Sequence, residues 1–281
     1  MKVVAFYTTY NEIRLLPWQH QWCKSQGVEM YVIDNMSTDG TKQYLEKYNI
    51  PHHSIDTDGA FDLRPLLSEI TTAIHKVKPD WLIYSGMDMF FVDKDSTIKE
   101  LCKRIRIHDP IAKVNFVSCN QYTFLHTSKK NATTPTTGNP FQNNFHYQFN
   151  GKHTFIAKYH PEITITPDRI NSPLADEYLI ISDTVIFETH AAKTINDRIQ
   201  LLKRRQKAWD NGMNRNWGWH YRQQAEQGFI FPEDQQTDIR TQPHLFELYK
   251  KLQEITPSHS PLPGGSGGPQ NTKHLTQNPG P

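Results

Sequence analysis

Polar side chains that could bind a ligand follow three short apolar runs in the first third of the chain. These clusters are Thr8–Glu12, Asp34–Thr41 and Ser85–Asp88. Asp, Asn, Ser and Gly are common turn and helix-cap residues, so one such cluster alone indicates a turn. Three of them at the ends of successive apolar runs favour a shared site of carboxylate, amide and hydroxyl groups.

The segments around these clusters predict an open α/β sheet. Apolar runs predict strands, and amphipathic segments between them predict helices. The expected strands are 3–7, 28–33 and 81–84, and the expected helices are 17–27, 41–48 and 63–77. Ser96 is expected to cap a further helix with Ile98, Leu101 and Ile105 on one side. Open α/β sheets bind ligands beyond the carboxyl ends of their strands, where the three clusters lie.

The clusters resemble the N-terminal half of family 2-like glycosyltransferases of the GT-A fold. The similarity is carried by Thr9-Tyr10-Asn11-Glu12 and by Asp34-Asn35-Met36-Ser37-Thr38-Asp39-Gly40-Thr41. The segment from Trp81 to Phe91 stands where that family carries its metal-binding Asp-x-Asp motif. The resemblance implies a GT-A-type α/β fold, with an open, mainly parallel sheet flanked by helices and an irregular C-terminal acceptor-side region.

The resemblance also implies transfer of a sugar from a nucleotide-diphosphate donor to a hydroxyl acceptor, either a glycan or a lipid-linked glycan. Asp34 is expected to accept a hydrogen bond from the base, and Asp88 to anchor Mn²⁺ or Mg²⁺, which neutralises the leaving diphosphate. The expected donor-binding residues are Thr9, Asn11, Glu12, Asp34, Asn35, Ser37, Asp39, Gly86, Asp88 and Arg198.

Two positions depart from the family pattern. Gly86 replaces the first Asp of the metal motif, and Met89 replaces the acidic residue that follows the second. A site with one carboxylate fewer is expected to bind a metal more weakly, and the nucleotide could be needed to complete the coordination. An alternative is therefore a catalytically impaired nucleotide-sugar or glycan-binding protein on the same fold. A nucleotidyltransferase is less favoured, because no Gly-rich phosphate loop follows the first expected strand.

The second half offers further metal and base candidates. A β-prone run over 178–187 precedes His190. In the GT-A fold a His after a late strand often supplies a metal ligand, so His190 is a candidate, with His220 as its rival. A packed or surface role is the alternative for either imidazole. An inverting transferase also needs a general base, for which Asp176 and Glu177 are candidates, with Asp183 and Glu188 not excluded.

A basic segment runs from Lys193 to Arg222, with eight Lys or Arg and two Asp, a net of +6. Thr194 is expected to cap a helix that buries its apolar side, namely Ile195, Ile199, Leu202 and Trp209. The basic side would carry Arg198, Lys203, Arg204, Arg205 and Lys207. It could be a solvated face, a grip on the donor diphosphate, or a peripheral contact with an anionic membrane.

A polar stretch over 126–152 is expected to be a long loop. It interleaves amides with aromatic rings: Asn131, Asn139, Asn143, Asn144 and Asn150 with Phe141, Phe145, Tyr147 and Phe149. Amides and stacked rings are typical of sugar sites, so this stretch is a candidate for acceptor recognition. The equally weighted alternative is a surface loop whose rings fold back onto the core.

Composition limits the remaining possibilities. Lys and Arg total 31 against 29 Asp and Glu, a net charge of +2, which argues against a nucleic-acid partner. The absence of a long apolar run or leader-like N-terminus predicts a cytoplasmic protein, peripheral to a membrane at most. The three cysteines have no CxxC spacing. We expect a nucleotide-sugar-binding half over 1–125, an acceptor-side half over 126–256, and a disordered Pro/Gly-rich tail over 257–281, which could be a linker remnant.

Overall fold

The computed structural model describes residues 1–108, 114–127, 138–166, 170–172, 179–190, 193–212, 231 and 233–257. Its larger sheet contains β1 Val3–Thr9, β2 Glu29–Asp34, β3 His52–Ser54, β4 Trp81–Ser85, β5 Met89–Asp93, β6 Phe116–Phe124, β7 His146–Lys158, β10 Leu179–Thr189 and β11 Thr237–Asp238. The helices are α1 Leu16–Ser25, α2 Thr41–Lys47, α3 Leu63–Val77, α4 Ile98–His108, α6 Ile195–Asp210 and α8 Pro243–Gln253.

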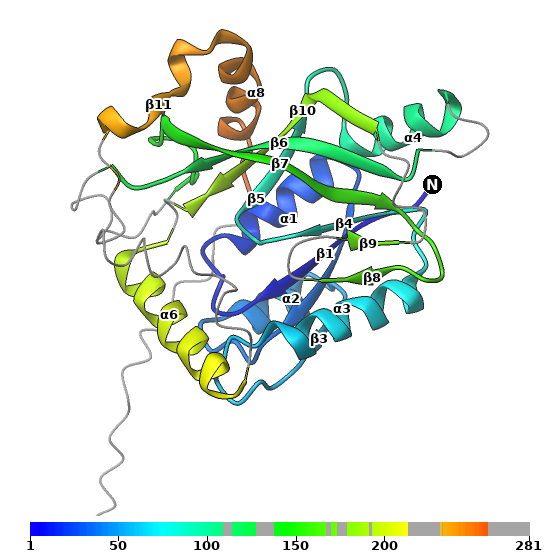
Figure 1. Ribbon diagram of the computed structural model, residues 1–281, viewed down its shortest axis with the longest axis vertical. Helices are drawn as coiled ribbons and strands as arrows, with labels where there is room; N and C mark the ends of the chain where they lie inside the picture. The colour runs from blue at the N-terminus through cyan, green and yellow to red at the C-terminus, as the bar shows by residue number, and fades with distance from the viewer. Residues whose placement is uncertain are drawn as a thin grey trace, which may run out of the picture.

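Within the described ranges, nine strands form a curled open sheet flanked by helices (Figure 1). The strand order is β3-β2-β1-β4-β7-β6-β10-β5, and β11 pairs with β7. β8 Thr164–Ile165 and β9 Ile170–Asn171 form a small separate sheet. The α/β class is confirmed, and the arrangement is consistent with a GT-A-like fold. Strands from both halves of the chain belong to the same sheet.

The strands that carry the polar clusters are parallel neighbours. β1 pairs with β2 on one side and with β4 on the other, in parallel. The register places Thr9 opposite Asp34 and Tyr7 opposite Ser85. All three clusters therefore begin at one edge of the sheet, as the spacing of the apolar runs predicts.

Beyond these parallel neighbours, the described part of the sheet also contains antiparallel pairs. β7 is antiparallel to β4 and β6, and β10 is antiparallel to β5 but parallel to β6. Residues 146–152, expected in a loop, belong to β7. This strand has polar residues at most of its solvent-facing positions, so its sequence lacks the apolar run that marks the buried strands.

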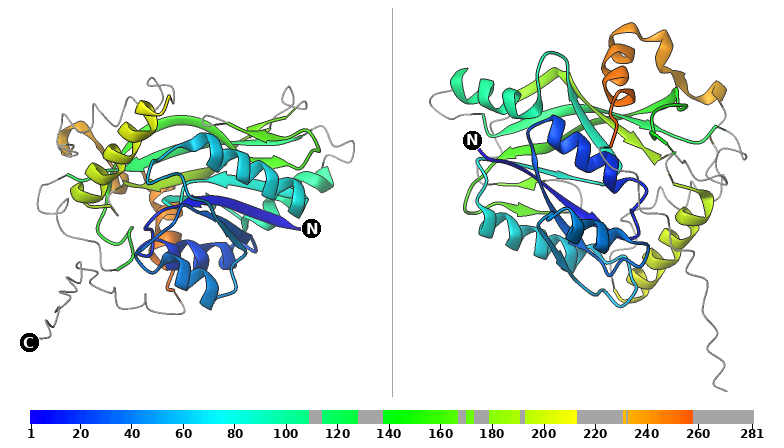
Figure 2. Two further views of the ribbon diagram at one scale, coloured as in Figure 1. Left: turned by 90° about the horizontal axis from the view of Figure 1, so that it is seen from below. Right: turned by 180° about the vertical axis from the view of Figure 1, so that it is seen from behind.

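Successive side chains of β1 point to opposite faces of the sheet, and each face is covered by helices. Val3, Ala5 and Tyr7 face a core shared with α1, α2, α4 and α8, while Val4 and Phe6 face a second core under α3. Figure 2 shows these helices on opposite sides of the strands. Both faces are buried, so the inner strands are continuously apolar and could be found from sequence.

Trp22 anchors α1 in the first core. Its side chain is fully buried, and its indole N–H donates to the Phe91 carbonyl at 3.0 Å. Burial of an aromatic side chain of this size contributes about 2 to 3 kcal/mol of stability. Pro17 lies in the first turn of the helix, and Gly27 follows its end at φ +66°, as the sequence predicts.

The cap expected at Ser96 lies one residue later. Thr97 Oγ1 accepts from the Glu100 backbone N–H at 3.2 Å, and the Glu100 carboxylate accepts from the Thr97 N–H at 2.9 Å. Ser96 instead donates its hydroxyl to the buried Asp93 carboxylate at 2.7 Å. Both hydroxyl residues could cap the helix, and because Asp93 binds the Ser96 hydroxyl, Thr97 takes the cap position.

In α6 the cap is confirmed but the buried face is not as predicted. Thr194 and Asp197 form a reciprocal capping box. Arg198, Arg204 and Arg205 are buried, whereas Ile199 is 37% exposed. Main-chain carbonyls of other segments accept from Arg198 and Arg204, and the Arg205 guanidinium lies over the Phe61 ring, so most of the expected basic face is directed at the protein.

The C-terminal region contains more regular structure than expected. α8 packs Leu248, Tyr249 and Leu252 into the first core. The predicted tail lies outside the described residues from position 258 onward. Cys23, Cys102 and Cys119 are buried free thiols. Among the described residues, helices that combine the length and the hydropathy of a membrane span are absent.

Candidate donor-binding site

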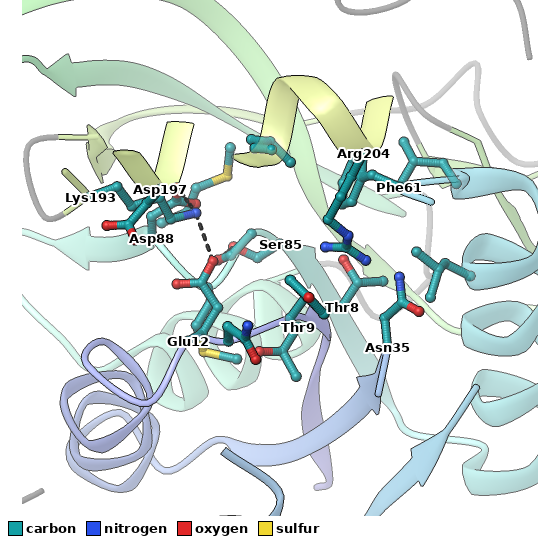
Figure 3. A pocket seen from close by; sticks show the side chains of 18 of the residues that line it. Thr8, Thr9, Glu12, Asn35, Phe61, Ser85, Asp88, Lys193, Asp197 and Arg204 are labelled. Atoms are coloured by element: carbon teal, nitrogen blue, oxygen red, sulfur yellow. Dashed lines mark hydrogen bonds and ion pairs between the residues drawn. The ribbon is translucent and has the colours of Figure 1, made fainter. Parts of the chain in front are cut away.

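A cavity of about 340 Å³ opens at the carboxyl ends of β1 and β4, beneath α6. Its lining residues include members of all three polar clusters, of 61–66 around the start of α3 and of 193–205, together with Phe155 and Glu188. Figure 3 shows Glu12, Asp88 and Lys193 at one end of the cavity, and Asn35, Phe61 and Arg204 at the other. The cavity therefore has a charged end and a more aromatic end.

Lys193 links two carboxylates at the charged end. Its Nζ lies 2.7 Å from Glu12 Oε1 and 3.2 Å from Asp88 Oδ2. The side chains of Lys193, Glu12 and Asp88 are only 21%, 15% and 13% exposed, so water screens these contacts little. Burial raises the pKa of Glu12 above its usual value, and Lys193 opposes this shift by favouring the carboxylate.

Asp88, Glu188 and His190 form a group that could hold a metal ion. One ligand atom from each lies within 4.8 Å of the others. Glu188 Oε1 lies 2.9 Å from His190 Nε2. The backbone N–H of Thr189 donates to the Asp88 carbonyl at 2.8 Å, which fixes the end of β10 against the turn that carries Asp88. Two carboxylates and an imidazole are a suitable donor set for Mn²⁺, and the carboxylates for Mg²⁺.

The supporting contacts of this group also fit a metal. Glu188 Oε2 accepts from Gln121 Nε2 at 2.9 Å and from Thr123 Oγ1 at 2.7 Å. Burial alone would raise the pKa of Glu188, but its contact with His190 and these two donors hold it below its usual value. His190 Nδ1 is buried and has no hydrogen-bond partner among the described residues, so one ring nitrogen is left for a ligand.

Gly86 allows the Asp88 side chain to fold back over the turn between β4 and β5. A Cβ at position 86 would lie 2.6 Å from Asp88 Oδ1, closer than real Cβ contacts come. An aspartate there would therefore require another orientation of the Asp88 carboxylate. The departure from the Asp-x-Asp pattern is thus coupled to the way in which Asp88 meets Lys193.

The opposite end of the cavity contains rings, amides and an arginine. Arg204 Cζ lies 3.3 Å from the centroid of the Tyr10 ring, and its Nη2 donates to the Ala60 carbonyl at 3.1 Å. Asn35 is buried beside it and donates to the same carbonyl at 3.2 Å. Thr9 is among the lining residues, and its buried Oγ1 has no hydrogen-bond partner among the described residues.

Three of the expected donor residues instead hold loops together. Asp34 is fully buried at the end of β2 and accepts from the Ser37 N–H at 3.1 Å. Ser37 Oγ accepts from the Asn11 N–H at 2.8 Å, and Asp39 Oδ2 accepts from the Ile13 N–H at 3.0 Å. Asp34, Ser37 and Asp39 are not among the described lining residues, whereas Thr9, Asn11, Glu12, Asn35, Gly86 and Asp88 are.

Arg198 lies behind the site. It is buried and donates to the His190 carbonyl at 2.8 Å, so it supports the segment that carries the imidazole. The base candidates Asp176 and Glu177 and the rival ligand His220 lie outside the described residues.

The described residues of the polar stretch over 126–152 include both buried and exposed side chains. Asn139 is buried and donates to the Leu252 carbonyl at 2.8 Å, and Phe141 and Tyr147 belong to the core, so these residues fit the structural alternative. Phe149 is 58% exposed and contacts the Tyr122 ring. Asn131 lies outside the described residues.

The sequence places Lys193 and Arg204 only within the basic segment, Tyr10 only within the first polar cluster, and Glu188 only among the possible bases. Glu188 could have been found, because residues two apart on a strand point to the same side and His190 was already a candidate. Lys193 follows the strand through a short turn whose geometry the sequence does not specify.

Comparisons with known proteins give limited information. No model of a protein family matches the chain, and no curated protein matches it. Among solved structures, S. aureus TarS 1-349 aligns at 15% identity and a TM-score of 0.38, over 73% of this chain and 65% of that one. The chain thus spans less than two thirds of that structure. The same protein in complex with UDP-GlcNAc aligns at 14% identity and a TM-score of 0.33, over 91% and 82%. HddC from Yersinia pseudotuberculosis aligns at 10% identity and a TM-score of 0.34, over 76% and 100%. Identities and TM-scores this low do not assign a function to this chain.

Proposed function

We propose that the protein is a glycosyltransferase that moves a sugar from a nucleotide-diphosphate donor to a hydroxyl acceptor. The observation that supports this most strongly is one cavity with a ring-lined end and a charged end that carries a metal-capable group. A nucleotide sugar has the same order of parts: an aromatic base, a ribose and a diphosphate. The sequence resemblance to family 2-like GT-A glycosyltransferases independently favours the same donor class.

The base and ribose are proposed to bind between Tyr10, Phe61 and Arg204. The two rings offer apolar surface, and the orphan hydroxyl of Thr9 offers a hydrogen bond to the ligand. Arg204 already stacks on Tyr10, so its planar cation is fixed before the ligand arrives. Asp34 could contact the base only through a movement that opens the buried end of β2.

The diphosphate is proposed to bind at the charged end. Asp88, Glu188 and His190 would hold Mn²⁺ or Mg²⁺, which when bound neutralises the charge that develops on the leaving diphosphate. Lys193 presents a further positive charge at the same place. Gln121 and Thr123 keep Glu188 oriented, and Arg198 does the same for the main chain at His190.

The acceptor is proposed to be a glycan or a lipid-linked glycan. The exposed Phe149 ring on β7 lies against the partly buried Tyr122 ring on β6, with centroids 5.5 Å apart, and offers a surface on which a sugar can stack. Asp176 or Glu177 as general base remains a prediction. Contact with an anionic membrane also remains a prediction, and in the described part of α6 it would depend on the exposed Lys203 and Lys207 rather than on the buried arginines.

Binding of the donor class can be tested by thermal unfolding with nucleoside diphosphates of each common base, with and without Mn²⁺. A ligand at about 100 times its Kd should stabilise the fold by about 2.7 kcal/mol, which raises Tm by roughly 5 to 10 °C in a chain of this size. Mn²⁺ with sulfate in place of the nucleotide is the control. The absence of a shift with every nucleotide would contradict the proposal.

One observation favours a second candidate, a protein that binds nucleotide sugars without turning them over. Lys193 already neutralises Asp88, and Gly86 and Met89 remove two carboxylates from the expected motif. Such a protein would show the thermal shift but release no nucleoside diphosphate from any donor. The two candidates therefore differ in donor hydrolysis, not in donor binding.

A further inference from the structure

The Lys193 ammonium group stands where a cation would be expected to meet the carboxylates of the site. It lies between Glu12, in the loop after β1, and Asp88, in the turn after β4 (Figure 3). Its distances to the two carboxylates, 2.7 and 3.2 Å, are those of charge-assisted hydrogen bonds. The Asp88 carboxylate, which belongs to the metal-capable group, is thus already engaged through Oδ2 by a positive charge of the chain itself.

The backbone around Lys193 holds this charge in place. The Lys193 N–H donates to the His190 carbonyl at 3.2 Å, and the Lys193 carbonyl lies 2.6 Å from His126 Nε2. The next residue, Thr194, is the N-cap of α6, with its hydroxyl 2.8 Å from Asp197. Hydrogen bonds therefore hold the main chain at Lys193 and at Thr194, from which the ammonium reaches the two carboxylates.

The charges around Lys193 determine how its contact with Asp88 affects metal binding. Glu12 and Asp88 are mostly buried, and two close carboxylates in such surroundings need a cation. A divalent ion at Asp88, Glu188 and His190 would bring a second cation close to the ammonium, and the two would repel each other. Ammonium and metal therefore compete for Asp88.

We propose that Lys193 is the resident cation of the donor site and that a divalent metal binds Asp88 only by displacing it. In the ligand-free protein, Lys193 then suppresses metal binding. When a diphosphate occupies the site, its negative charge can accommodate both cations, and the ammonium is free to contact the phosphate oxygens. The second step rests on the proposed function, whereas the suppression of metal binding does not.

The proposal can be tested by titrating the ligand-free protein with Mn²⁺ and measuring free Mn²⁺ by electron paramagnetic resonance. Lys193→Met, which keeps the aliphatic stem and removes the charge, should bind Mn²⁺ about ten- to a hundredfold more tightly than the unaltered protein. Lys193→Arg, which keeps the charge, should not. Equal affinity in the unaltered protein and in Lys193→Met, or no binding in either, would overturn the proposal.

Lys207→Met is the matched control. Lys207 lies in α6, and its Nζ pairs with Asp58 at 3.0 Å, away from the metal-capable group. Its loss should leave Mn²⁺ affinity unchanged, and circular dichroism would confirm that every variant is folded. If Lys193→Met leaves the chain unfolded, Lys193→Gln, a shorter neutral residue, replaces it in the same titration.

A second titration separates this inference from the proposed function. In the presence of EDTA, inorganic pyrophosphate should bind the unaltered protein and should lose about tenfold in affinity in Lys193→Met. If Mn²⁺ binding changes as expected but no nucleoside diphosphate stabilises the protein, the resident-cation proposal stands and the transferase assignment fails. If nucleotides bind but Lys193→Met leaves Mn²⁺ affinity unchanged, the resident-cation proposal fails and the transferase assignment stands.

Discussion

Asp88→Asn is expected to lower the rate of donor hydrolysis by at least about a hundredfold, because removal of one carboxylate charge weakens stabilisation of the leaving diphosphate by about 3 kcal/mol or more. Asp88 belongs both to the metal-capable group and to the Lys193 contact, so the change affects both the proposed metal and the ammonium. Asparagine keeps the shape and the turn, and the loss should therefore appear in kcat more than in folding.

The matched control for this variant is Asp95→Asn, an exposed aspartate shortly after β5 and outside the donor cavity. It should retain the full rate. Rates are measured as nucleoside diphosphate released per enzyme under saturating donor and Mn²⁺. If the rate of Asp88→Asn lies within about twofold of that of the unaltered protein, Asp88 does not take part in the reaction. A loss of several kcal/mol of stabilisation would instead lower the rate about a hundredfold.

Glu188→Ala is expected to lower the free energy of unfolding by about 3 to 5 kcal/mol, because it removes a buried carboxylate and leaves the three side chains that contact it without their partner. The side chain of Glu188 is 8% exposed and contacts His190, Gln121 and Thr123. Urea denaturation measures the loss directly. Glu188→Gln, which preserves most of the hydrogen-bonding shape, should cost less than the alanine variant.

The control for Glu188 is Glu162→Ala, at an exposed position before β8. Surface substitutions of this kind change stability by less than about 0.5 kcal/mol. If Glu188→Ala destabilises the protein no more than Glu162→Ala does, the Glu188–His190 pair is not a buried structural unit. The contacts with Gln121 and Thr123 would then not hold Glu188 in its orientation.

The strands that position the site could be predicted because they are buried on both faces. β1, β2 and β4 are continuous apolar runs, and each ends where its polar cluster begins. Thr9, Asn11, Glu12 and Asp88 were therefore assigned to one edge of the sheet from sequence, and the structure brings them to one cavity. Strand β7 escaped prediction because its polar residues obscure the periodicity.

Other parts of the site depend on contacts between distant segments. The arginines of α6 turn inward because carbonyls such as that of Ala60 accept their hydrogen bonds, and helical periodicity alone predicts the opposite face. Lys193 meets Glu12 only because α6 follows β10 back across the ends of β1 and β4. Asp34, Ser37 and Asp39 have the residue types of a ligand site, yet their partners are backbone N–H groups of neighbouring loops.

A donor-hydrolysis screen tests the central claim most directly. The unaltered protein is incubated with common nucleotide sugars and Mn²⁺, and release of nucleoside diphosphate is followed without an added acceptor. The proposed transferase should release nucleoside diphosphate from at least one donor by slow transfer to water, and Asp88→Asn should not. Binding of a nucleotide sugar, shown by thermal stabilisation, without release from any donor would contradict a transferase and favour the binding protein.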